Sequence, residues 1–127
     1  MRRNGLHTAA LLGAVLTSLL LAACQNEGRW YPGAEVSVQS SYEFAPGPGA
    51  KAILVTLIIH NTSSTTINTG VVTLKVTTDR REYFQTASTA TAIIPGGKVA
   101  LPVTVPYLDS AEQVAAGGVT VYDSYFN

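Results

Sequence analysis

The residue with the most distinctive chemistry in this 127-residue sequence is its only cysteine, which ends the tetrapeptide Leu21, Ala22, Ala23 and Cys24. Two arginines stand near the start of the chain, and the run 9–23 before the thiol contains no charged residue. This run is shorter than the roughly 20 residues that a bilayer-spanning helix needs. Its length, its basic start and the polar residues after it are typical of the apolar core of an export signal. Cys24 therefore marks the end of a predicted signal segment.

A leucine and two small residues before a cysteine resemble the lipobox of bacterial lipoproteins, which signal peptidase II cleaves. The resemblance implies that Leu21, Ala22 and Ala23 are recognised by the peptidase and that Cys24 carries diacylglycerol and an N-acyl chain such as palmitate. The mature protein would begin at Cys24 and lie in the bacterial cell envelope, anchored to a membrane. Gln25, which is not an aspartate, fits release to the outer membrane in a Gram-negative organism. The alternative is a buried helix or an uncleaved anchor.

The predicted organisation is a signal peptide over 1–23, a lipidated tether over 24–33 and one domain over 34–127. Removal of the signal leaves 104 of the 127 residues, enough for one small domain. This mature part has six basic and eight acidic residues, and the net charge of −2 argues against nucleic acid as a partner. Because its only cysteine is the anchor, the domain forms no internal disulfide and depends on an apolar core.

Catalytic and metal-binding patterns are sparse in the mature chain. His60 is its only histidine, so it is the only candidate base for a Ser-His-Asp arrangement, and no Gly-x-Ser-x-Gly elbow supplies a nucleophile. A metal site needs three or four suitably spaced ligands, and a phosphate loop needs amide donors that the prolines of 45–50 lack. The acids are scattered singly: Glu35, Glu43, Asp79, Glu82, Asp109, Glu112 and Asp123. We expect no enzymatic activity, no metal and no cofactor other than the covalent lipid.

Several segments are candidates for binding. The run Gln85–Ala92 is uncharged and short of large side chains, so at a sheet edge it could pair with a strand of another protein; we expect a neighbouring strand to cover it instead. Asp79–Glu82 is expected to be a solvated turn. Asn61-Thr62-Ser63 matches a glycosylation sequon, but we expect it to be only the turn at the end of a strand. Aromatic residues that could stack on a ligand are Trp30, Tyr42, Tyr83, Tyr107 and Tyr125. We expect Trp30 and Tyr31 to rest on lipid headgroups or to cap the core.

Alternating polarity predicts strands along the whole domain. Val36, Val38, Tyr42 and Phe44 share one side of the first, and 52–59 is apolar enough for a central strand covered on both faces. Further strands are expected over 72–77, within 83–94, over 99–107 and over 119–126, the last with Val119, Val121 and Tyr125 on one side. Pro102 and Pro106 place the strand 99–107 at a sheet edge. One or two helical turns are expected between Leu108 and Gly118, with a capping box from Ser110 to Gln113.

Six or seven strands and almost no helix predict an all-β fold, an antiparallel immunoglobulin-like β-sandwich; a small barrel is the alternative. An apolar strand running into Asn61-Thr62-Ser63-Ser64, and later Ile94-Pro95-Gly96 before an alternating strand, resemble small envelope modules of the LEA14-like and FxLYD types. The Phe-x-Leu-Tyr-Asp stretch itself is missing. The expected function is a non-enzymatic, lipid-anchored envelope lipoprotein that binds or positions another envelope protein. The alternative is a lipoprotein that binds a sugar or a small apolar molecule.

Overall fold

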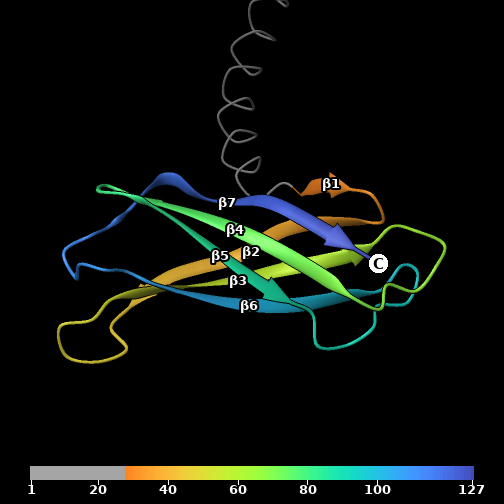
Figure 1. The fold of residues 1–127 in the computed structure, drawn as a ribbon, viewed down its shortest axis with the longest axis horizontal. Coiled ribbons are helices and arrows are strands. Elements are labelled where there is room, and N and C mark those ends of the chain that lie inside the picture. The colour runs from red at the N-terminus through yellow and green to blue at the C-terminus, as the bar shows by residue number, and fades with distance from the viewer. Residues whose placement is uncertain (1–27) are drawn as a thin grey trace, which may run out of the picture.

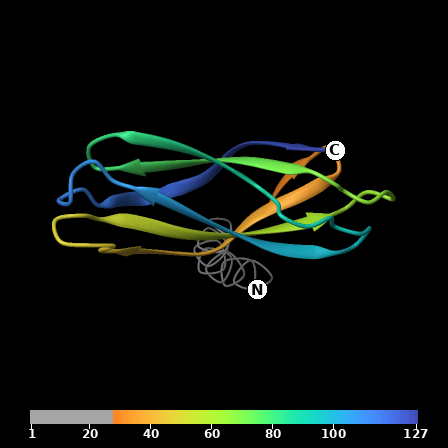
Figure 2. The ribbon, with the colours of Figure 1, turned by 60° about the horizontal axis from the view of Figure 1, so that its bottom comes forward.

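The computed structural model describes residues 28–127, which fold into two antiparallel β-sheets packed face to face (Figures 1 and 2). The four-stranded sheet has the order β1-β2-β3-β6 and the three-stranded sheet the order β5-β4-β7. The prediction of an all-β sandwich is confirmed, and the sheets do not close into the alternative barrel. No helix long and apolar enough to cross a membrane occurs in this part of the chain. The strands are β1 (Arg29–Tyr31), β2 (Ala34–Phe44), β3 (Ala52–Asn61), β4 (Gly70–Thr78), β5 (Glu82–Ser88), β6 (Lys98–Pro106) and β7 (Val114–Phe126).

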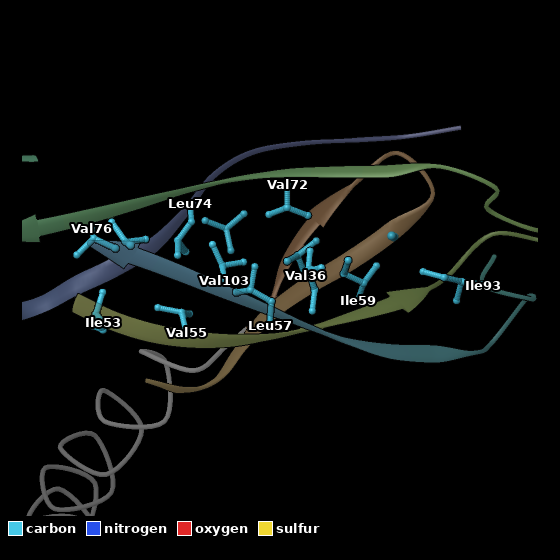
Figure 3. Close-up of a cluster of buried hydrophobic side chains, with 14 of the residues drawn as sticks. Val36, Ile53, Val55, Leu57, Ile59, Val72, Leu74, Val76, Ile93 and Val103 are labelled. Carbon is cyan, nitrogen blue, oxygen red and sulfur yellow. The ribbon is translucent and has the colours of Figure 1, made fainter. Parts of the chain in front are cut away.

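The core lies between the two sheets and consists almost entirely of aliphatic side chains (Figure 3). Alternate residues of β3, β4 and β6 point into it, because side chains of a strand project to opposite faces in turn. Leu57 and Leu74, from opposite sheets, have no solvent exposure. Outside the strands, Ile67 and Ile93 form an isolated bridge that closes one end of the core. Apolar burial therefore holds the sandwich together without a disulfide among these residues.

The four-stranded sheet is buried on one face only. Leu54, Thr56 and Ile58 of β3 point away from the core and are half-buried. The expectation of a strand covered on both faces is therefore wrong for β3, although its central place between β2 and β6 is confirmed. The apolar composition of this strand comes from its inner face together with Leu54 and Ile58 on the half-buried outer face.

The segment predicted as an irregular tether contains a strand. Arg29, Trp30 and Tyr31 form β1, which pairs with the start of β2 through the turn at Pro32 and Gly33. The turn forms because Gly33 adopts a φ of 96°, which side chains other than glycine rarely allow. Tyr31 packs against the core, whereas Trp30 is 67% exposed. β1 is therefore part of the sandwich, and only Tyr31 of the aromatic pair caps the core.

Bulges change which side chains face the core in β2 and β7. The register of β2 on β3 shifts between Val38 and Ser40, so Tyr42, predicted on the same side as Val36, is 57% exposed. The register of β7 on β4 shifts between Thr73 and Leu74. As a result Tyr125 is 63% exposed, and Phe126 packs on the core in its place. The predicted sidedness is thus wrong for the second half of each strand.

The predicted helical segment after Leu108 is a single tight turn, and β7 already starts at Val114. A capping box does form, but one residue earlier than expected. The Asp109 carboxylate accepts a hydrogen bond from the Ala111 amide, and the Glu112 carboxylate accepts one from the Asp109 amide. The turn stops there because the backbone of Gln113 exchanges hydrogen bonds with Asp79 of the β4–β5 turn. A contact distant in sequence therefore keeps this turn from continuing into a helix.

Candidate functional site

The predicted lipidation site lies outside the described residues. Leu21, Ala22, Ala23 and Cys24 precede residue 28, so processing and acylation remain predictions. The structure does show where the chain enters the domain. Gly28 leads into β1 at the edge of the four-stranded sheet, and four residues separate Cys24 from Arg29.

His60 lies at the end of β3, opposite Glu35 of β2. Its Nδ1 is 3.8 Å from the Glu35 carboxylate, and both side chains are about a quarter to a third exposed, at 31% and 28%. Within residues 28–127 no hydroxyl donates a hydrogen bond to this histidine. His60 therefore does not form the hydrogen-bonded Ser-His-Asp arrangement that a hydrolase of this kind needs. No group of three or more potential metal ligands occurs in the same residues.

Three of the seven acids that the sequence offers as carboxylate pairs are paired with a surface lysine or arginine. Glu43 lies 3.2 Å from Lys51, and Glu82 lies 3.0 Å from Lys75. Asp109 pairs with Arg80 at the surface. Asp79 and Asp123 accept hydrogen bonds from backbone amides. These carboxylates therefore act as partners of turns and strand ends.

Glu112 differs from these acids because it has no solvent exposure. Its carboxylate accepts hydrogen bonds from the Tyr83 hydroxyl at 2.6 Å, the Thr78 hydroxyl at 2.7 Å and the Asp109 amide at 3.0 Å, and the Arg81 Nε lies 3.3 Å away. Burial opposes ionisation of the carboxyl, but these donors outweigh it and lower its pKa. The capping-box spacing from Asp109 to Glu112 is the sequence signal that could have located it.

Tyr83 and Tyr107 extend this cluster toward the core. Their rings stack with centroids 5.6 Å apart. Burial and the hydrogen bond to Glu112 raise the pKa of Tyr83, and burial with the nearby Glu43 carboxylate raises that of Tyr107. The Lys51 Nζ donates to the Glu112 carbonyl at 2.8 Å. The cluster thus joins the β2–β3, β4–β5 and β6–β7 connections at one end of the sandwich. Its role is therefore structural.

The aromatic residues proposed as a stacking platform do not converge. Tyr83 and Tyr107 are part of the cluster just described, and Trp30 lies on the outer face of the four-stranded sheet. Tyr42 is at the far end of β2 next to Phe44, and Tyr125 is on the outer face of the other sheet. A ligand-binding site built from these rings would need them on one concave surface. The alternative function loses its proposed site.

The outer strand edges offer a different kind of site, because an unpaired strand edge presents backbone donors and acceptors to other chains. On β6, hydrogen bonds from Asn61 to Gly97 and from Tyr107 to Lys51 fix which residues face β3. Pro102 and Pro106 occupy alternate positions, where an N–H would point to the free edge. The predicted edge position of this strand is confirmed, and its prolines remove two of the donors that an added strand would use.

The edges of β7, β2 and β1 are also protected or short. Arg29 donates to the Val121 carbonyl at 2.7 Å, so a side chain occupies an acceptor on the free side of β7. The part of β2 that β1 does not reach is interrupted by the bulge after Val38. β1 itself has three residues. Short, bulged or capped edges add strands poorly.

β5 differs from these edges. It pairs with β4 in an unbroken register over seven residues and with no second strand among residues 28–127. Thr78 donates to Arg81 at one end of this ladder and Thr89 to Gly70 at the other. Because bonded and non-bonded pairs alternate in an antiparallel ladder, the N–H and C=O groups of Phe84, Thr86 and Ser88 point to the free edge.

No family model, no curated protein and no solved structure matches this chain. The resemblances to lipoproteins and to small envelope modules therefore stay predictions. The β5 edge contains no proline and no lysine, and its single charged residue, Glu82, stands at its start, paired with Lys75. The expectation that a neighbouring strand covers Gln85–Ala92 is wrong for 85–88, which lie on this free edge.

An aromatic pair lies on the outer face beside this edge. The rings of Phe84 on β5 and Tyr122 on β7 meet edge to face with centroids 4.9 Å apart, across the intervening strand β4. They are 52% and 57% exposed. Phe84 therefore offers an apolar side chain next to the free backbone groups of β5.

Proposed function

We propose that this protein is a non-enzymatic, lipid-anchored module of the bacterial cell envelope that binds another envelope protein by strand addition at β5. The observation that carries the proposal is the position of the free edge relative to the point where the chain enters the domain. A lipid on Cys24 would hold the β1 side near the membrane. The β5 side would then be presented to the surrounding compartment.

The sheet orders support this geometry. β1 and β7 are the edge strands on one side of the sandwich and contact each other across the two sheets. β5 and β6 are the edge strands on the other side and also contact each other. Figure 1 shows β1 beside β7, with β6 along the opposite side of the molecule. The entry point and the unprotected edge are therefore separated by the full width of the domain.

The fitting partner is an extended, largely uncharged segment of another protein. Phe84, Thr86 and Ser88 together offer up to six backbone hydrogen-bonding groups, and a net hydrogen bond contributes about 0.5–1.5 kcal/mol. A partner with an apolar side chain opposite Phe84 would add a cross-strand contact of roughly 0.2–1 kcal/mol. Strand addition supplies affinity through the backbone and selectivity through such alternate side chains.

The test compares two edges that differ in protection. A photo-crosslinking residue replaces Ser88 on β5 in one full-length variant and the exposed Thr104 on β6 in another, and both are expressed in cells. We expect a reproducible protein adduct from position 88 and none from position 104. Adding Thr86→Pro to the position-88 variant removes one outward N–H and leaves the backbone bonds to β4 in place, although the exposed side-chain bond to Thr73 is lost, and it should abolish the adduct. Equal adducts from both edges, or an adduct that survives Thr86→Pro, would contradict strand addition.

Anchoring has its own test. In cells fed labelled palmitate, the protein should take up the label and appear in the membrane fraction at the mass of the processed, acylated chain. Cys24→Ser should lose the label and accumulate at the mass of the full 127-residue chain. A labelled Cys24→Ser protein would show that the lipid is attached elsewhere.

A further inference from the structure

The side of the domain where the chain enters carries exposed aromatic side chains on both outer faces. Trp30 on β1 is 67% exposed and Tyr125 on β7 is 63% exposed. Trp30 belongs to the four-stranded sheet and Tyr125 to the three-stranded sheet, so they flank the β1/β7 edge from opposite faces. Indole and phenol rings prefer the boundary between water and the lipid headgroups.

Two contacts show that β1 lies alongside the tyrosine-bearing part of β7. The Arg29 guanidinium donates to the Val121 carbonyl at 2.7 Å. At the other end of β1, a Cβ placed on Gly33 would lie 3.8 Å from the Phe126 side chain. Trp30 lies between these two points along the edge. Trp30 and Tyr125 therefore lie on the same side of the sandwich.

The length of chain before β1 limits how far this side can move from a lipid anchor. From Cys24 to Arg29 is five residues, and an extended chain spans at most about 3.6 Å per residue, so the distance is at most roughly 18 Å. After crossing one headgroup region of roughly 5–8 Å, the chain can carry Arg29 at most about 10–13 Å beyond the membrane surface. A domain on so short a tether rests against the bilayer.

We infer that the β1/β7 edge lies on the membrane surface, with Trp30 and Tyr125 among the lipid headgroups. The inference rests on the anchoring of Cys24 under the proposed function. The occupant of this edge is a lipid surface because the tether brings one there. The charges on the edge are few: Arg29 is held by the Val121 carbonyl, and Glu35 and Asp123 are the nearby acids. Insertion of the aromatic rings, and not attraction to anionic lipid, makes the contact between the β1/β7 edge and the membrane. This orientation turns β5 away from the membrane.

The test uses the fact that Trp30 is the only tryptophan of the chain. Protein purified from the membranes of cells that express the full chain is reconstituted into vesicles of phosphatidylethanolamine and phosphatidylglycerol, with or without brominated acyl chains. We expect brominated lipid to remove roughly half of the Trp30 emission, as for an indole at headgroup level. Acrylamide in the water should quench Trp30 several-fold less on vesicles than on protein unfolded in urea. Emission untouched by brominated lipid, with full quenching by acrylamide, would overturn the inference.

A matched reporter on the opposite side controls for nonspecific adsorption. The double variant Trp30→Phe, Thr104→Trp moves the only indole to the exposed β6 edge. This indole should be quenched by acrylamide and not by brominated lipid. Equal bromine quenching at both positions would contradict a defined orientation.

Failure of the anchor and failure of the orientation give different results. The mass of the purified protein reports acylation of Cys24 before any fluorescence is measured. If the mass shows no lipid, the proposed anchoring is wrong. The orientation is then tested separately on protein whose Cys24 is coupled to a maleimide lipid in the same vesicles, and it is overturned if Trp30 remains unquenched there.

Discussion

Replacement of Asn61 by alanine is expected to unfold one end of the sandwich. Asn61, the last residue of β3, has no solvent exposure. Its Nδ2 donates to the carbonyls of Thr65 and Ile93, each at 2.8 Å. Its Oδ1 accepts from the Ser63 amide at 2.9 Å and the Ser63 hydroxyl at 2.7 Å. One side chain thus fixes the 62–66 turn to the bridge between Ile67 and Ile93.

The loss in the free energy of unfolding follows from these four hydrogen bonds. A hydrogen bond contributes a net 0.5–1.5 kcal/mol or so, which gives about 2–6 kcal/mol if all four are lost. The Ile93 carbonyl still accepts the Ile67 amide, and the half-buried Ser63 can bond to water, so the lower half of that range applies. We expect Asn61→Ala to lose about 3 kcal/mol of a total that for such domains is roughly 5–15 kcal/mol.

Urea unfolding followed by circular dichroism measures this loss. With a slope of about 1–1.5 kcal/mol per molar urea, the midpoint should fall by about 2–3 M. Asn68→Ala is the matched control, because Asn68 is exposed in the same connection and bonds there through its backbone. It should change stability by no more than about 0.5 kcal/mol. Equal midpoints for the two variants would refute the role given to Asn61.

Asn61→Asp gives a second check, based on pH. The introduced carboxylate keeps the bonds from Ser63, but its second oxygen faces the Thr65 and Ile93 carbonyls, which accept and do not donate. This repulsion raises the folded-state pKa of the new carboxyl above the ordinary value of about 3.9. The loss relative to the natural protein is therefore largest at pH 7 and shrinks as the pH falls through the raised pKa. A loss that does not change with pH would show that the carbonyls do not act on this position.

Three further perturbations test other parts of the structure. Because the pKa of Glu112 is lowered, its contribution to the free energy of unfolding is present above the ordinary value of 4.5 and is lost as the pH falls through the folded-state pKa. Glu112→Gln should therefore be less stable than the natural protein at pH 7. The urea midpoints of the two proteins should converge in acid. Convergence at neutral pH would contradict the buried cluster. Leu74→Ala should lower the free energy of unfolding by about 2–5 kcal/mol, because Leu74 has no solvent exposure. The control Ile94→Ala, at a residue that is 66% exposed, should lower it by about 0.5 kcal/mol or less. Similar melting temperatures for the two variants would place Leu74 outside the core. Pro102→Thr restores an outward N–H on β6 and should increase self-association in sedimentation velocity, and an unchanged monomer fraction would show that this proline does not protect the edge.

The amino-acid pattern predicts local features correctly where a strand has a regular register. The alternation in β4 and β6 and the edge position indicated by Pro102 agree with the structure. Sidedness fails for Tyr42 and Tyr125 because a bulge between strands depends on the partner strand as well as on the residues themselves. The predicted helix fails for a similar reason, since Asp79, distant in sequence, binds the backbone of Gln113.

The composition of Gln85–Ala92 indicates a candidate edge, and the structure shows a free edge over 85–88 in place of the expected covering strand. The absence of charge in this segment is equally consistent with a covered strand and with a free edge. The order β5-β4-β7 decides between them, and no property of the segment itself encodes that order. The buried Glu112 was missed because seven acids look alike in a sequence until a fold places one of them among three hydrogen-bond donors.

By itself, the sequence determined that the chain forms strands, that apolar burial without disulfides stabilises them, and that prolines mark one edge. These are consequences of periodicity and of residue chemistry, which act over a few neighbouring positions. Only the tertiary structure decided which edge stays open, which acid is buried, and that the chain enters the domain on the side opposite β5. Those features depend on pairings between strands far apart in the chain, where packing of the two sheets, and not local preference, selects the arrangement.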